Sequence, residues 1–231
     1  MTEYVTRFNV RQRIEHIAIM SLFIILSVTG LPQKFYQAGW AETLIVWMGG
    51  VDRIRFFHRL AGILFTLLTF THLTTAIGLV MTGRSKLSMV PTRQDFTDAI
   101  VTLKFYLGTS DEHAKFGRFD YRQKFEYWGL VLGAVIVIAT GLVLYFPLLV
   151  TRFLPGELIP AAKLAHGNEA LMAFLVVILW HIYNAHLNPD VFPFDTSIFT
   201  GKVSRERMEH EHPLEWAEIE EQRRHRAHLR G

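Results

Sequence analysis

The chain has 231 residues, of which 50% are hydrophobic and 13% are aromatic, and its formal net charge is +3. Because the sequence holds no cysteine, it excludes disulfides, thiolate-bound iron–sulfur clusters and the C-x-x-C-H attachment of c-type haem within this chain. Any redox cofactor would therefore be held without a covalent link, by histidine, methionine or the backbone.

Four apolar segments follow one another along the chain, at residues 14–31, 56–81, 127–150 and 164–187. Each approaches the ~20 apolar residues that cross a bilayer as a helix. We therefore predict an all-α integral membrane protein, built as a four-helix bundle, whose first helix is retained rather than cleaved as a signal peptide. The predicted domains are a transmembrane domain at residues 1–190 and a charged cytoplasmic tail at 191–231. We expect the tail to be a solvated extension that is helical in part.

Lysines and arginines mark one side of the predicted bundle. Three precede the first segment, eight lie between the second and the third, and seven follow the fourth, whereas the two remaining loops hold three and two. By the positive-inside rule, both termini and the loop between the second and third helices face the cytoplasm. This one-sided placement around membrane segments also argues against nucleic acid as the partner of the basic residues.

Two connecting segments carry the pattern of short helices at the membrane surface. Residues 37–50, QAGWAETLIVWMGG, place tryptophan, leucine and methionine at helical spacing. In residues 92–108, one face of a predicted helix is lined by Phe96, Ile100 and Leu103, with Tyr106 as a further candidate. We therefore add short interfacial helices to the four spans, with membrane lipids as their partners.

Six of the eleven histidines lie within the apolar segments or at their ends: His16, His58, His72, His166, His181 and His186. A histidine in hydrocarbon is costly and is a functional candidate by default. His58 and His72 are 14 residues apart, which returns to nearly the same helix face about 21 Å along the axis. His166 and His181 are 15 residues apart, which corresponds to about 22 Å with a rotation of about 60°. Each helix thus carries one histidine near each side of a hydrocarbon core that is about 30 Å thick.

This arrangement predicts two haem groups, each clamped between histidines of two facing helices. The chain direction puts His58 and His166 at the outer side, where they would hold one haem. His181 lies near the inner side, and either His16 or His72 could be its partner. Two axial imidazoles produce a low-spin iron suited to electron transfer. The alternatives are a zinc site, which needs three or four ligands at one depth, and buried histidines bonded to carbonyl groups.

Five stretches carry a family resemblance: RQRIEHIAIMSLFIILSVTG, RFFHRLAGILF, FGRFDYRQKFEYW, HGNEALMAFLVVILWHIYNAH and GKVSRERMEHEHPLEW. Together they resemble the cytochrome b (gamma) subunit of membrane-bound formate dehydrogenases. The resemblance covers most of the chain and implies two non-covalent haem b groups. It implies that His58 and His166 hold the outer haem iron, and that His16 and His181 hold the inner one. His72 departs from the family pattern and stays the alternate inner ligand.

The resemblance also implies a quinone site beside the inner haem, at the start of the third helix and the end of the fourth. The matching residues are Asp120, Tyr121 and Arg122, with Asn184 and His186 as further candidates. Asp120 and Arg122 depart from the family pattern, which has Asn and Gly at these places. Asp120 and His186 could carry protons, because quinone reduction takes up two of them.

The implied function is electron transfer across the bacterial inner (cytoplasmic) membrane by a multi-pass anchor subunit with no catalytic residue of its own. One end would meet a periplasmic, formate dehydrogenase-like partner with an iron–sulfur or multihaem electron-transfer subunit and a catalytic subunit. The other end would exchange electrons with the quinone pool, either menaquinone or ubiquinone. The alternatives are a cytochrome b subunit of a hydrogenase, thiosulfate reductase or other respiratory complex running in either direction, and a non-redox membrane anchor or transporter.

Overall fold

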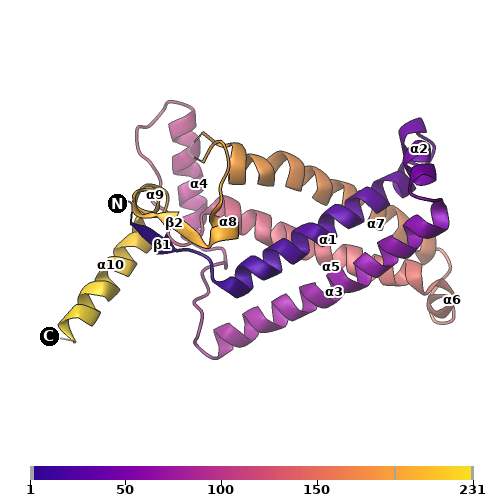
Figure 1. Ribbon diagram of the computed structural model, residues 1–231, viewed down its shortest axis with the longest axis horizontal. Coiled ribbons are helices and arrows are strands. Elements are labelled where there is room, and N and C mark those ends of the chain that lie inside the picture. The colour runs from indigo at the N-terminus through magenta and orange to yellow at the C-terminus, as the bar shows by residue number, and fades with distance from the viewer. Residues whose placement is uncertain (1–2, 190, 230–231) are drawn as a thin grey trace. The chain divides into compact units, whose positions relative to one another are not determined.

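The computed structural model describes residues 3–189 and 191–229, and it is mostly helical (73%). Within these residues, four helical runs are long and apolar enough to cross a membrane. They are α1 (Val10–Lys34), α3 (Val51–Met81), α5 (Tyr121–Tyr145) and the run Leu158–Leu187, which comprises α7 (Leu158–Leu175) and the π-helical segments η1 (Val176–His181) and η2 (Tyr183–Leu187) (Figure 1). The predicted all-α protein with four membrane-length helices is confirmed.

Contacts within the chain divide it into two units. The membrane unit comprises Arg11–Thr82 and Leu130–Asp195, and the terminal unit comprises Met1–Val10, Gly83–Gly129 and Thr196–Gly231. Helix α5 begins in the terminal unit and continues in the membrane unit. The membrane unit also holds two short helices, α2 (Gly39–Trp47) and α6 (Pro147–Val150), and α2 confirms the helix predicted in residues 37–50. Few side chains of the long helices are buried within the protein, which leaves their apolar surfaces available to lipid.

The start of α5 lies six residues before the predicted third span at residues 127–150. Asp120 caps this helix: its Oδ1 accepts a hydrogen bond from the backbone nitrogen of Gln123 at 2.8 Å. In return, Gln123 Oε1 accepts one from the backbone nitrogen of Asp120 at 3.1 Å. This reciprocal capping box satisfies two backbone donors that a helix start otherwise leaves open, so the helix begins at Tyr121.

The end of α5 also differs from the prediction. The helix ends at Tyr145, and Phe146 leaves the helical conformation with φ −117° and ψ 51° before Pro147 begins α6. A proline has no N–H to donate to the preceding turn, and its ring disfavours the helical conformation of the residue before it. A single helix that continues to residue 150 was therefore a wrong prediction.

The terminal unit joins the two ends of the chain through a two-stranded antiparallel sheet. Strand β1 (Tyr4–Thr6) pairs with β2 (Lys202–Ser204) in the register Tyr4↔Ser204, Val5↔Val203 and Thr6↔Lys202. The unit also contains α4 (Arg93–Tyr106), α8 (Ser197–Thr200), α9 (Arg205–Glu211) and α10 (Pro213–His228). A small buried core is formed by Val5, Val203, Met208 and Trp216. The helices predicted in the tail are confirmed. The expectation of a solvated extension is wrong for β2, α9 and the start of α10, which pack with the N-terminal strand, whereas residues 221–229 are exposed.

A buried polar cluster joins three distant segments of the terminal unit. Arg7 is 4% exposed, forms an ion pair with Glu215 and donates to the backbone oxygen of Arg118. His212 donates from Nδ1 to the backbone oxygen of Gly117 at 2.7 Å, and its Nε2 lies 3.2 Å from the Arg7 guanidinium. Burial, and then the positive charge of Arg7, lower the pKa of His212 from 6.5 to about 4. His212 is therefore neutral at pH 7 and accepts a hydrogen bond from Arg7.

Candidate functional site

Four of the predicted histidine ligands form two pairs in the membrane unit. The rings of His58 on α3 and His166 on α7 have centroids 6.2 Å apart, and those of His16 on α1 and His181 in η1 have centroids 6.1 Å apart. An imidazole nitrogen binds a metal at about 2 Å and lies about 1.1 Å from its ring centroid, so two rings that face each other across one metal ion have centroids about 6.3 Å apart. Rotation about the metal–nitrogen bond leaves the angle between the ring planes free, so the observed 79° and 32° are both compatible with this. Each pair thus has a spacing at which its two histidines could bind one metal ion.

The hydrogen bonds of His58 determine which of its nitrogens can bind a metal. Its Nδ1 lies 2.9 Å from the hydroxyl oxygen of Thr29 on α1. That hydroxyl donates its own hydrogen to the backbone oxygen of Ile25 at 2.6 Å, so the oxygen accepts from Nδ1–H of His58. The proton therefore sits on Nδ1, which leaves the lone pair of Nε2 for a metal. Metal-binding histidines usually hold their second nitrogen in this way.

His166 is held by the same kind of contact from a different helix. Its Nδ1 lies 3.0 Å from the backbone oxygen of Val137 and 3.1 Å from the hydroxyl oxygen of Thr140, both on α5. The Thr140 hydroxyl donates to the backbone oxygen of Ile136 at 2.6 Å, so both oxygens can only accept from His166. His58 and His166, the pair predicted to lie on the outer side, therefore share one tautomer, with Nε2 available as the ligand.

A glycine follows each of these threonines, and each glycine makes room for the histidine ring. A Cβ atom on Gly30 would lie 3.0 Å from Cε1 of His58, and a Cβ atom on Gly141 would lie 3.3 Å from Cε1 of His166. We call Thr29–Gly30 and Thr140–Gly141 the Thr–Gly cradles. The sequence prediction missed these threonines, although the T-G dipeptide repeats inside two predicted spans.

The second pair, predicted to lie on the inner side, distinguishes between His16 and His72, the two candidate partners of His181. The ring opposite His181 is that of His16. His72 instead contacts Glu15, one residue before His16, with 2.9 Å between His72 Nδ1 and a carboxylate oxygen. The other carboxylate oxygen of Glu15 accepts a hydrogen bond from Arg11 at 2.8 Å. His72 thus interacts with Glu15 and, through it, with Arg11, both on α1. Glu15 is an acidic residue in a membrane-length helix that the sequence prediction did not single out.

The helix that carries His166 and His181 is not a uniform α-helix. Its segment Val176–His181 is π-helical, and such a wider turn takes up an extra residue without breaking the helix. The predicted rotation of about 60° between the two histidines assumed α-helical geometry throughout, so it does not apply here. With one residue absorbed, the 15-residue spacing becomes equivalent to the 14 residues that separate His58 from His72.

The predicted quinone residues fall in both units. In the terminal unit, Asp120 is 6% exposed, caps α5 and accepts two hydrogen bonds from Arg122 at 2.7 and 3.0 Å. Tyr121 has its ring 6.2 Å from that of Phe116. In the membrane unit, Asn184 donates to the backbone oxygen of Trp180 at 2.8 Å. His186 stacks on Phe194, with ring centroids 4.1 Å apart. Asp120 thus has a structural role, and a quinone-binding role for these five residues stays a prediction.

A zinc site would require a different grouping of ligands. Across residues 3–189 and 191–229, no three side chains of the His, Cys, Asp and Glu types gather closely enough to hold a metal ion. Histidines that come in facing pairs, with the second nitrogen engaged by the protein, match haem ligation better than a tetrahedral zinc centre.

Paired histidines between membrane-length helices define the class of membrane-bound cytochromes b. Residues 7–191 match the family described as prokaryotic cytochrome b561, and the chain belongs to this family. It is 25% identical over 183 residues to the formate dehydrogenase cytochrome b556(fdo) subunit of Escherichia coli strain K12, a match that covers 78% of each chain. It is 22% identical over 220 residues to the nitrate-inducible formate dehydrogenase cytochrome b556(Fdn) subunit of the same strain, covering 95% of this chain and 93% of the relative.

These relatives confirm the predicted resemblance to formate dehydrogenase cytochrome b subunits. Membership of the family implies haem b as the cofactor and electron transfer in the membrane as the role. With its four membrane-length helices, the chain is a multi-pass bacterial membrane protein.

Proposed function

We propose that this chain is the di-haem cytochrome b subunit of a respiratory complex, and that it passes electrons between a partner oxidoreductase and the quinone pool of the inner membrane. The observation that carries the proposal is the pair of histidine couples, His58–His166 and His16–His181, each at the spacing of two ligands on one metal ion. Haem b supplies a one-electron carrier when it is bound between two histidines. Because histidines of the chain would supply both ligands of each iron, the sites would suit electron transfer rather than oxygen chemistry.

The residues around the couples would hold the ligands at two depths of the bilayer. Helix α1 contributes to both, through Thr29 at the outer couple and His16 at the inner one, and these residues lie about 20 Å apart along the helix axis. The Thr–Gly cradles would keep the outer rings in one tautomer and one place. Glu15 would hold His72 away from the inner couple, which supports His16 as the ligand.

The proposed partner is a periplasmic, formate dehydrogenase-like assembly with an iron–sulfur electron-transfer subunit and a catalytic subunit. Its support is that both relatives named above are subunits of formate dehydrogenases, together with the basic residues that predict cytoplasmic termini. Electrons would enter at the outer couple, leave at the inner couple and reduce menaquinone or ubiquinone, with Asp120, Tyr121, Arg122, Asn184 and His186 as candidate contacts. The subunits that co-purify with the native protein test this assignment directly.

The haem sites are tested by counting haem in the purified chain with the pyridine haemochrome assay. We expect two haems per chain, one after His58→Ala or His16→Ala, and still two after His72→Ala. A wild-type protein without haem would refute the proposal as a whole. Two haems in His16→Ala, together with one in His72→Ala, would instead exchange the inner ligand and leave the rest of the proposal standing.

A further inference from the structure

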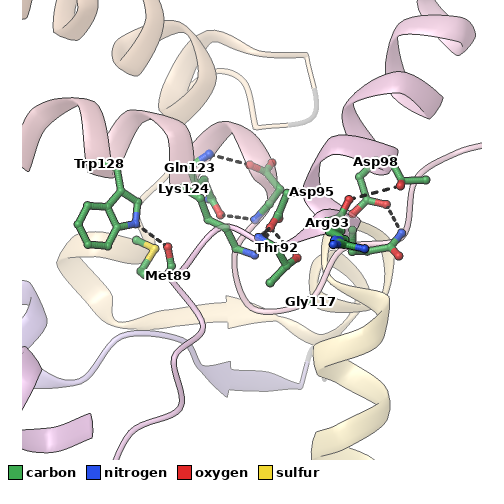
Figure 2. A network of polar contacts seen from close by, with 12 residues as sticks. Met89, Thr92, Arg93, Asp95, Asp98, Gly117, Gln123, Lys124 and Trp128 are labelled. Carbon is green, nitrogen blue, oxygen red and sulfur yellow. Dashed lines mark hydrogen bonds and ion pairs between the residues drawn. The ribbon is translucent and has the colours of Figure 1, made fainter.

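Helix α4 is attached to the first turns of the membrane-length helix α5. Asp95 on α4 accepts hydrogen bonds from the ammonium group of Lys124 on α5 at 2.7 and 2.9 Å, and both side chains are buried (Figure 2). Thr92 caps α4 through the same carboxylate, which accepts from the threonine backbone nitrogen at 2.6 Å and hydroxyl at 2.8 Å. Four residues beyond Lys124, the indole nitrogen of Trp128 donates to the backbone oxygen of Met89 at 2.9 Å. The segment that leads into α4 is thus held at the end of a membrane span.

Helix α4 buries acidic residues and exposes apolar ones, the opposite of a helix on the surface of a water-soluble domain. Its acidic residues Asp95 and Asp98 are 9% and 8% exposed. Its apolar residues form an exposed stripe: Phe96 is 72% exposed, Ile100 55%, Leu103 57%, and Leu107, which follows the helix, 67%. Leaving four such side chains in water is unfavourable, because burying apolar surface is the main favourable term in folding and association. Exposed apolar surfaces of this kind mark interaction sites.

The basic residues of α4 lie along one edge of this stripe. With Phe96 at 0°, the stripe residues lie between about −20° and 40° around the helix axis, and Arg93 and Lys104 lie at about 60° and 80°. The buried Asp95 and Asp98 lie at about 260° and 200°, on the opposite side. An apolar stripe with cations along its edge is the pattern of a helix that lies in the plane of a membrane surface containing anionic lipids.

We propose that the stripe of Phe96, Ile100, Leu103 and Leu107 docks into the lipid surface beside α5, with Arg93 and Lys104 at the level of anionic headgroups. Three observations carry this: the attachment to the first turns of a membrane span, the exposed apolar stripe, and the cations on its edge. A bilayer is the occupant that all three fit, because α5 must cross the lipid surface close to where Lys124 holds α4. The docking is independent of haem and of the identity of the partner subunits.

The absence of native cysteine allows a direct measurement. The variants Phe96→Cys, Ile100→Cys and Leu103→Cys of the full chain are each labelled with a nitroxide spin label. They are reconstituted into vesicles of zwitterionic and anionic phospholipid. Gln94→Cys, on the polar side of α4, serves as the matched control. We expect the three stripe labels to collide with oxygen more than with an aqueous nickel chelate, at depths of about 5–10 Å below the headgroups. The Gln94 label should favour the nickel chelate.

Two results would overturn the proposal. Labels at all three stripe positions that are open to nickel would show that the stripe lies in water. Labels that neither reagent reaches would show that protein covers the stripe, and dipolar broadening between labels would identify that protein as a second copy of the chain. Because the stripe is exposed in the folded protein, these substitutions should leave the fold intact, and an unchanged haem content in each labelled variant verifies this.

Discussion

The outer histidine couple depends on two glycines, and replacing them by alanine is the sharpest test of the site. Carbon atoms in contact prefer a separation of about 3.5–4.0 Å. The Cβ of Gly30→Ala would lie 3.0 Å from Cε1 of His58, and that of Gly141→Ala 3.3 Å from Cε1 of His166. The His58 ring must therefore move by about 0.5 Å or more, and the His166 ring by about 0.2 Å. Both displacements act on rings whose Nδ1 is already held by threonine.

The expected magnitude follows from the general cost of overpacking, about 1–3 kcal/mol. At a factor of ten for each 1.4 kcal/mol, this weakens binding of the outer haem by about 5- to 140-fold. We expect Gly30→Ala near the upper end and Gly141→Ala near the lower end, because the first clash is the closer one.

The assay measures haem retention when each variant is mixed with excess apomyoglobin, which captures released haem. The inner haem of the same sample is an internal standard, and Gly78→Ala is the matched control, because a Cβ there has no atom within 4 Å. We expect the outer haem to leave fastest from Gly30→Ala, more slowly from Gly141→Ala, and at the wild-type rate from Gly78→Ala. The steric reasoning is refuted if Gly30→Ala retains its outer haem as the control does.

Three further predictions concern the π-helical segment, the threonines and the terminal unit. Deleting Ile178 from η1 removes the extra residue and should restore a regular α-helix with both haems still bound. Inserting an alanine beside Ile178 should instead displace His181 and cause loss of the inner haem. Loss of that haem in the deletion variant would show that the π-helical segment does not absorb an extra residue. Thr29→Val should keep the haem held by His58 but raise its midpoint potential by about 20–60 mV, the equivalent of one hydrogen bond of about 0.5–1.5 kcal/mol that makes the imidazole a stronger donor to ferric iron. Thr140→Val should raise the potential less, because the backbone oxygen of Val137 still accepts from His166. Spectroelectrochemical titration measures both shifts, and an unchanged or lower potential in Thr29→Val would contradict the reasoning. The pKa of His212 falls from 6.5 to about 4 on folding, so between these pH values the unfolded state binds the extra proton and stability is lost as the pH falls, by about 3 kcal/mol once the pH is below both values. Limited proteolysis of the C-terminal tail should therefore accelerate between pH 6.5 and 4 in the wild type, and a His212→Gln variant that shows the same acceleration would exclude this histidine as the cause.

Membrane spans could be predicted well because their signal is local. Hydrocarbon offers no hydrogen-bond partners, so an apolar run of sufficient length forms a helix whatever its neighbours are. The ends were predicted less well where polar capping or proline decided them, as at Asp120 and Pro147. Both signals are present in the sequence, as D-Y-R-Q and F-P, but hydropathy alone does not weigh them.

The terminal unit could not be predicted in the same way. Strand β1 and its partner β2 lie about 200 residues apart, and each is only three residues long. Neither strand has a pattern strong enough to be recognised alone, because such a short pair forms only where the side chains around it supply a core. Here that core includes Met208 and Trp216, from helices that follow β2.

The sequence by itself determined the number of membrane-length helices, because each apolar run is long enough to span a bilayer. The rise of a helix further predicts the depth of each histidine. It also carried the resemblance to the cytochrome b subunits. Only the tertiary structure decided that His16 rather than His72 lies opposite His181, that threonines orient the outer pair, and that a π-helical segment absorbs the fifteenth residue. The physical reason is that depth is a property of one helix, whereas the partner of a side chain depends on how several helices rotate and pack against one another.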